Sequence, residues 1–255
     1  MIIKIAIFVI IAYLFLEIVA YCNKKKNKGA KELLEGRCEN AGLPTGVHKQ
    51  NFYEKYIKRS LDKVLSFCGL LMLSPVLVII SIAVYINDPG PILFSQKRVG
   101  KNKELFMLHK FRSMKMSTPH DMPTHLLENP DQYITKVGKI LRKTSLDELP
   151  QIWDIFVGNM SVIGPRPALW NQYDLIEERD KYGANDVIPG LTGWAQINGR
   201  DELEIDAKAK FDGDYTDNIS LLFDVKCFFG TITSVLKRDG VVEGGTGEFN
   251  KEKMK

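Results

Sequence analysis

The chain is poor in cysteine and histidine, and neither residue type is arranged in the pattern of a structural site. Its four cysteines form no Cys-x-x-Cys pair, and two of them lie within apolar runs. This pattern argues against a disulfide framework and favours a reducing compartment. The four histidines show no His-Glu-x-x-His or similar spacing, so a structural zinc site is not expected. The sequence also has no internal repeat.

Charge of either sign is not in large excess. The 255 residues carry a formal net charge of +4, and 45% of them are apolar. This composition fits one domain of ordinary size together with membrane-embedded segments. The basic residues are unevenly distributed, and their placement is more informative than their number. We expect no nucleic-acid partner.

The first long apolar run covers residues 2–21 and is interrupted by only one lysine and one glutamate. About 20 apolar residues are enough to cross a bilayer as a helix. A lysine-rich flank follows at residues 23–31 and favours the cytoplasmic side. A cleaved signal peptide is the alternative, but no Ala-x-Ala-like site follows. The sequence therefore predicts a transmembrane helix over residues 1–22 and a cytoplasmic linker over 23–50.

The second long apolar run covers residues 61–86 and has Ser74 and Pro75 near its middle. Basic residues flank it on both sides, and both flanks therefore prefer the cytoplasm. Pro75 supplies a bend, and Ser74 can satisfy freed backbone groups. Arms of about 12 residues reach roughly halfway through the hydrocarbon core. The pattern predicts a re-entrant helical hairpin, with an ordinary spanning helix as the alternative.

Two short apolar runs, residues 92–96 and 105–111, are separated by a turn sequence and predict a β-hairpin. Lys110 and Arg112 lie at the end of its second strand. Both are candidate site residues, although charges on a solvated strand edge are common.

Two cations, Arg142 and Lys143, are followed closely by two adjacent carboxylates, Asp147 and Glu148. Ser145 and Glu148 have the spacing of a capping box, so the carboxylates could simply be acidic residues in the first turn of a helix. A helix N-terminus also binds anions through its free N–H groups. The two interpretations are compatible, and we expect the carboxylates to lie at a helix start that binds phosphate.

Arg166 lies between two prolines in the sequence Gly-Pro-Arg-Pro, so its backbone has little freedom. A guanidinium held in this way suits bidentate recognition of phosphate. A structural ion pair with a nearby carboxylate is the alternative.

A glycine-rich stretch at residues 188–200 contains Gln196, Asn198 and Arg200. These polar residues alternate with apolar ones, which predicts that they share one face of a strand. That face could bind a base, a ribose or a phosphate. Further on, residues 203–214 suggest a solvated helix, and the apolar run at 219–236 fits either a core helix or an interfacial helix.

From about residue 56 to residue 240, the chain resembles the bacterial sugar transferases, the monotopic phosphoglycosyl transferases. The resemblance rests on several separated stretches that occur in the same order. They are residues 74–75, 96–100, 110–114, 142–151, 164–167 and 190–200.

The resemblance implies an α+β membrane-associated fold. It consists of an N-terminal transmembrane helix, the re-entrant hairpin and a small mixed α/β catalytic domain with interfacial helices. The catalytic domain would span residues 51–240 and a flexible tail residues 241–255. The implied location is the bacterial inner membrane, with the catalytic domain in the cytoplasm. A homodimer and downstream glycosyltransferases are further partners that the resemblance allows.

The implied reaction transfers a sugar 1-phosphate from a UDP-sugar to undecaprenyl phosphate and releases UMP. In the family pattern Asp147 is the nucleophile, which forms a covalent aspartyl-phosphosugar intermediate and binds Mg²⁺, and Glu148 is its partner. Phosphate-binding roles fall on Lys110, Arg112, Arg142 and Arg166, and nucleotide-sugar-binding roles on Gln196, Asn198 and Arg200. The reaction would start the assembly of a capsule, exopolysaccharide, O-antigen or glycoprotein glycan.

The resemblance does not determine the sugar, and one alternative function stands beside the transferase. Residues 201–204 differ from those of many family members, which affects the sugar more than the reaction, and an N-acetylated 6-deoxy sugar is one expectation alongside glucose and galactose. A catalytically silent membrane scaffold for glycan-assembly proteins is the alternative function.

The re-entrant hairpin predicts that single cysteines placed at residues 50 and 105 lie on the same side of the membrane. The native cysteines are first replaced, and each new thiol is then labelled with a membrane-impermeant reagent in intact and in opened cells. Labelling from opposite sides would refute the hairpin.

Overall fold

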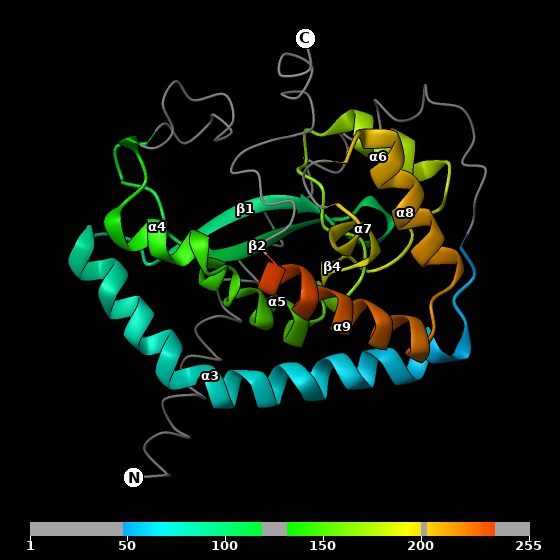
Figure 1. The fold of residues 1–255 in the computed structure, drawn as a ribbon, viewed down its shortest axis with the longest axis horizontal. Coiled ribbons are helices and arrows are strands. Elements are labelled where there is room, and N and C mark those ends of the chain that lie inside the picture. The colour runs from blue at the N-terminus through cyan, green and yellow to red at the C-terminus, as the bar shows by residue number, and fades with distance from the viewer. Residues whose placement is uncertain (1–47, 119–131, 200–202, 238–255) are drawn as a thin grey trace.

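The computed structural model describes residues 48–118, 132–199 and 203–237. The predicted N-terminal transmembrane helix, almost all of the linker, Arg200 and the tail lie outside the described residues. In the described part, a small mixed α/β domain rests on one long apolar helix (Figure 1), as the sequence predicted.

The elements alternate between helices and short strands. In chain order they are the π-helix η1 (Tyr53–Lys58), α3 (Arg59–Asn87), β1 (Leu93–Val99), the 3₁₀ turn η2 (Lys101–Lys103), β2 (Leu105–Phe111), α4 (Lys136–Lys143), the 3₁₀ turn η5 (Leu146–Glu148), α5 (Gln151–Val157), β3 (Ser161–Ile163), α6 (Tyr173–Asp180), β4 (Gly190–Thr192), α7 (Trp194–Ile197), α8 (Ile205–Asp217) and α9 (Leu221–Lys237).

The predicted hairpin segment is one continuous helix with a bend. Helix α3 runs beneath α5 and α9 and bends near its middle (Figure 1), and Pro75 lies inside it. Proline removes a helical donor and crowds the preceding turn, and Ser74 Oγ donates to the carbonyl of Leu71 at 2.8 Å. Within the described residues, η1 and α3 together form the one helix that is long and apolar enough to cross a membrane. A re-entrant course through a bilayer stays a prediction.

The first arm of this helix has a polar face and an apolar face. Four buried polar residues recur at a spacing of four, which places them on the side of the helix that faces the domain. They are Glu54, Lys58, Asp62 and Ser66. Large apolar side chains of the same arm, such as Val64 and Leu65, are exposed. The first arm therefore lies against the domain on one side only.

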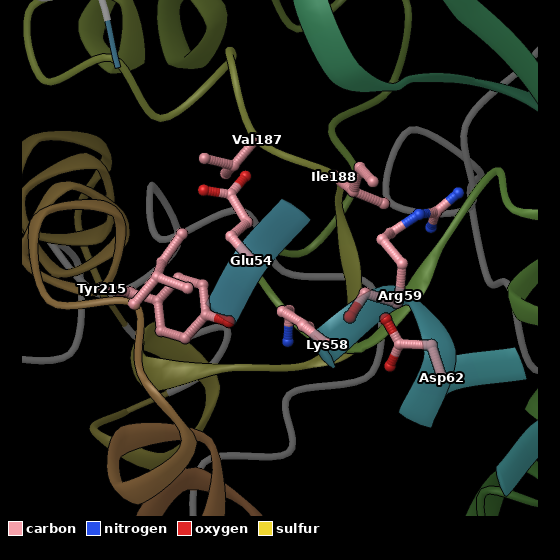
Figure 2. A pocket seen from close by; sticks show the side chains of 9 residues that line it. Glu54, Lys58, Arg59, Asp62, Val187, Ile188 and Tyr215 are labelled. Atoms are coloured by element: carbon pink, nitrogen blue, oxygen red, sulfur yellow. The ribbon is translucent and has the colours of Figure 1, made fainter. Parts of the chain in front are cut away.

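A buried cluster on Asp224 ties the start of this helix to the end of the chain. The carboxylate of Asp224, on α9, accepts from Lys58 Nζ at 2.6 Å and from the hydroxyls of Tyr53 and Tyr215, each at 2.7 Å. Figure 2 shows Lys58 and Tyr215 lining a small cavity next to this cluster, together with Asp62. One carboxylate thus joins η1 to α8 and α9, which lie far from it in the sequence.

The hairpin of β1 and β2 is confirmed, with Phe94 opposite Lys110. A second, parallel pair joins β3 to β4. The predicted strand around Gln196 is wrong, because residues Trp194–Ile197 form the short helix α7. Gly199 then adopts a φ of 144°, a conformation that suits glycine and ends the turn. Four alternating residues were too few to separate a strand from one helical turn.

The last two helices differ in how they meet the solvent. Helix α8 is more than a solvated helix, because it buries Ala209, Asp212 and Tyr215 against the domain. Helix α9 exposes an apolar face that includes Leu222 and Phe229, as an interfacial helix would.

We expect Lys58→Met to lower the free energy of unfolding by about 3 kcal/mol, because it leaves Asp224 buried without its cationic partner. Thermal and denaturant unfolding of the detergent-solubilised protein measure the change. Lys181→Met is the control, since Lys181 pairs with Glu178 at the surface and should give no measurable change. Equal stability of the Lys58 variant and the unmodified protein would contradict the anchoring role of this cluster.

Candidate functional site

The two adjacent carboxylates, Asp147 and Glu148, lie on the 3₁₀ turn η5 between α4 and α5. The predicted capping box is wrong. Ser145 has a φ of 56°, and its side chain makes no capping hydrogen bond. A left-handed residue at this position turns the chain sharply at the end of α4, at a cost of about 1 kcal/mol. The turn, and not a capped helix start, therefore orients the two carboxylates.

Glu148 is held between two cations that come from different parts of the chain. Its Oε1 accepts from Lys110 Nζ at 2.7 Å and from Arg166 Nη2 at 2.6 Å. Burial alone would raise the pKa of Glu148, but Arg166 and Lys110 together hold that pKa well below its usual range. The structure thus brings together three residues that the sequence predicted, and it also gives Arg166 the ion pair that was considered as the alternative.

Asp147 differs from its neighbour. It is half-buried, and it forms no ion pair within the described part of the chain. Burial raises the pKa of Asp147, Lys110 and Arg142 act to lower it, and the charge of Glu148 raises it further. The net effect is a carboxylate that is more basic than an ordinary aspartate and has no cation bonded to it. Of the two carboxylates, Asp147 is therefore the one available to react.

The two further predicted cations, Arg142 and Arg112, have different partners. The Nε of Arg142 donates to Ser113 Oγ at 2.9 Å, and its charge acts on Asp147. Arg112 is buried instead beside Asp88, with Nη2 bonded to the Asp88 carbonyl and 3.6 Å from the Asp88 carboxylate. Asp88 directly follows α3, so Arg112 secures the end of that helix. The structure gives no geometric support to the predicted phosphate contact of Arg112.

The loop that carries Arg166 is held through its carbonyl groups. The carbonyls of residues 165, 166 and 167 accept, in that order, from the N–H of Gly190 at 2.9 Å, from Arg179 Nη2 at 3.0 Å and from Arg98 Nη1 at 3.0 Å. Each donor belongs to a different element: β4, α6 or β1. The restraint expected from the two prolines is thus strengthened by three hydrogen bonds.

Arg98 is a site residue that was not singled out from the sequence. It is half-buried near Arg166 and Glu148, and its pKa is lowered to about 10 by desolvation and by the charge of Arg166, while Glu148 opposes the shift. The pairing of Phe94 with Lys110 puts Arg98 on the same face of the hairpin as Lys110. The alternation of side chains along the predicted hairpin would have placed Arg98 on the same face as Lys110.

Two of the three predicted nucleotide-binding residues, Gln196 and Asn198, do not share one face, and Arg200 lies outside the described residues. Gln196 is buried, and neither atom of its amide has a hydrogen-bond partner among the described residues. Asn198 is exposed and donates to the carbonyl of Trp194 at 2.7 Å. Because this segment is helical, alternate residues point in different directions.

The site carries more cations than carboxylates, which suits an anionic ligand. Four cations act on the two carboxylates or on one another; they are Arg98, Lys110, Arg142 and Arg166. The described residues hold no group of three or more metal-ligating side chains. Mg²⁺, however, is commonly held by one or two carboxylates together with substrate phosphates and water. Asp147 therefore fits a magnesium site that a phosphate ligand would complete.

Comparison with known proteins shows which family this chain resembles. The sequence model of the family described as bacterial sugar transferase matches residues 53–238. A UDP-glucose:undecaprenyl-phosphate glucose-1-phosphate transferase of Escherichia coli K12 is 42% identical over 186 residues, which are 70% of this chain and 40% of that protein. An undecaprenyl-phosphate galactose phosphotransferase of Salmonella typhimurium is 35% identical over 201 residues, 73% of this chain and 42% of that protein.

A shorter relative is matched over most of its length. The exopolysaccharide production protein ExoY of Sinorhizobium fredii is 34% identical over 192 residues, 70% of this chain and 84% of that protein. The chain spans about two fifths of the length of the Escherichia and Salmonella relatives.

We expect Glu148→Gln to lower the free energy of unfolding by about 2 kcal/mol at pH 7, because Lys110 and Arg166 lose their shared counter-ion. The pKa of Glu148 is depressed in the fold, so its stabilisation is present above the unfolded value of about 4.3 and is lost as the pH falls below it. The stability gap between the two proteins should therefore narrow from about pH 4 downward. A gap that stays constant from pH 7 to pH 3 would contradict the role of the charge.

Proposed function

Because this chain belongs to the bacterial sugar transferase family, we propose that it transfers a sugar 1-phosphate from a UDP-sugar to undecaprenyl phosphate and releases UMP. One observation carries the proposal. Asp147, a carboxylate with no ion pair among the described residues, is adjacent to Glu148, a carboxylate that holds two cations within a cationic cluster. This arrangement suits attack on an anionic diphosphate, whose charge must be neutralised.

In the proposed first step, an oxygen of Asp147 attacks the β-phosphorus of the UDP-sugar. A bond forms between the carboxylate oxygen and phosphorus, and the bond from that phosphorus to the UMP oxygen breaks. UMP leaves with the electron pair, and the sugar phosphate stays on Asp147 as an acyl phosphate. In the second step, a phosphate oxygen of undecaprenyl phosphate attacks the same phosphorus and releases Asp147. The product is a lipid diphosphate-sugar.

The environment of Asp147 supports its role as nucleophile. Burial makes the carboxylate more basic, since it raises the pKa, and a more basic oxygen is a better nucleophile. Lys110 and Arg142 act in the opposite direction and favour the ionised form that attacks. Mg²⁺, held by Asp147 and the diphosphate, would supply further neutralisation of the phosphoryl oxygens.

Glu148 suits a positioning role better than a role as general base. Its depressed pKa makes it a weak base at neutral pH. Its two ion pairs hold Lys110 and Arg166 beside Asp147, where both can contact the diphosphate. Glu148 thus organises the cations, and Asp147 performs the covalent chemistry.

The long apolar helix supports an active site at the membrane surface. Near its start, Asp62 accepts from the N–H of Val162 at 3.0 Å, and near its end Ile80 and Val84 pack against Leu141. One domain therefore holds both arms of α3, which favours a re-entrant course over a span that would separate the two ends by about 30 Å of hydrocarbon. The exposed apolar face of α9 also favours an interfacial position.

This location gives access to the polyprenyl acceptor, which lies in the bilayer, and to UDP-sugar from the cytoplasm. We place the protein in the inner membrane, with its catalytic domain in the cytoplasm. Its product would then serve downstream glycosyltransferases in the assembly of an exopolysaccharide or another surface glycan. No observation favours the alternative of a silent scaffold, which would have no need of a carboxylate without an ion pair inside a cationic cluster.

Purified protein supplied with Mg²⁺, undecaprenyl phosphate and a panel of UDP-sugars should release UMP with at least one sugar. Asp147→Asn should reduce this release at least about a thousandfold, because an amide cannot form the acyl phosphate. Asp174→Asn, at an exposed position of α6, is the control and should keep full activity. No UMP from any sugar in the panel would refute the proposed reaction, and retained activity of the Asp147 variant would refute the nucleophile.

A further inference from the structure

A buried ion pair lies directly behind the loop that carries Arg166. Arg179, on α6, bonds Asp212, on α8, through Nε at 2.8 Å and through Nη2 at 2.5 Å. The same Nη2 donates to the main-chain carbonyl of Arg166 at 3.0 Å. The side chains of Arg179 and Asp212 are only 4% and 1% exposed. Neither residue was a candidate from the sequence, where Asp212 was one of the charges on a helix expected to be solvated.

On the basis of the proposed transferase function, we propose that Arg179 and Asp212 are positioning residues that set the direction of the Arg166 guanidinium. The side chain of Arg166 is 37% exposed and is not held by packing alone. Its direction depends on the ion pair with Glu148 at one end and on the orientation of its backbone at the other, and Arg179 holds the carbonyl at that backbone position. Asp212 in turn holds Arg179, because it accepts both of the hydrogen bonds that fix the guanidinium.

The local sequence explains why a side chain, that of Arg179, has to hold the main chain at Arg166. The residues on either side of Arg166 are prolines, which have no N–H to donate. The loop is therefore restrained mainly through its carbonyls. The carbonyls of Pro165 and Pro167 are held by Gly190 and Arg98, and the carbonyl of Arg166 is held by Arg179. Removing Arg179 would free the central peptide of the three.

Stability alone is a poor explanation for this pair. Two buried charges lose their hydration, and buried ion pairs can often be replaced by apolar residues of similar volume without loss of stability. A small displacement of a group that contacts the reacting phosphate, by contrast, can cost up to about a hundredfold in rate. The pair should therefore affect the rate of turnover more than the stability of the fold.

The test is a double-mutant cycle on UMP release. The pair is replaced as a unit by combining Arg179→Leu with Asp212→Leu, so that no single buried charge remains. In the otherwise unmodified protein we expect a 10- to 100-fold loss in kcat, with a thermal unfolding midpoint close to that of the parent. In an Arg166→Ala background the same replacement should cost less than about threefold, because its effect passes through Arg166.

Two further variants make the result specific. Arg179→Lys keeps the charge beside Asp212 but has one donor nitrogen in place of the guanidinium fork, and we expect it to fold normally and to lose activity. Lys103→Met removes the partner of Asp180, the residue after Arg179, and should leave activity unchanged. If the apolar double variant does not fold, the cycle is measured with Arg179→Lys. If Arg166→Ala has no detectable rate, Arg166→Lys replaces it.

Equal losses in both backgrounds would overturn the positioning role, since they would show a general structural defect. Full activity of the pair variant in the otherwise unmodified protein would overturn it as well. Failure of the proposed function itself is recognised separately, because the parent protein would then release no UMP from any UDP-sugar.

Discussion

The ion pairs of Glu148 with Lys110 and Arg166 are the interaction on which the site depends. Burial lowers the pKa of Arg98 and of Lys110, and the charge of Arg166 lowers both further, so without an anion among them these three cations would repel one another. A single glutamate offsets this repulsion before any substrate binds. The remaining positive charge is what an incoming diphosphate would neutralise. The same residue thus stabilises the empty site and preserves its attraction for phosphate.

The chemistry of the site was more predictable than its geometry. Lys110, Asp147, Glu148 and Arg166 stand in short, distinctive motifs, and the structure brings all four together. The capping box failed because Ser145 adopts a left-handed backbone, which residue spacing cannot reveal. The contact of Arg112 with Asp88 could not be predicted either, since Asp88 lies 24 residues earlier and meets it only in the folded chain. Contacts between distant segments are the part of a fold that local patterns miss.

The long apolar helix also has contacts with distant segments that its own sequence could not predict. Its composition and its basic flanks predicted a membrane segment with a bend, and the structure has a bent apolar helix. Glu54, Lys58 and Asp62 stand at a spacing of four in the sequence, but of these only Lys58 entered the prediction, as a basic charge of the flank. Their role could be recognised only from their partners in the folded chain, and one of these, Asp224, lies near the other end of the sequence. Hydropathy describes how apolar a segment is, and the tertiary contacts decide which side of it faces the protein.

Three hydrogen bonds to the carbonyls of residues 165–167 hold the Arg166 loop, and we call them the carbonyl clamp. Through this clamp, activity depends on whichever of the three donor elements is least stable. Its three donors come from β1, β4 and α6, and separate elements of a protein can open locally at different free energies. Local opening of any one of them releases a carbonyl and loosens the same loop. Heat or denaturant would then abolish turnover while most of the domain is still folded, so the temperature at which activity is lost reports the weakest of these elements and not the global unfolding of the protein.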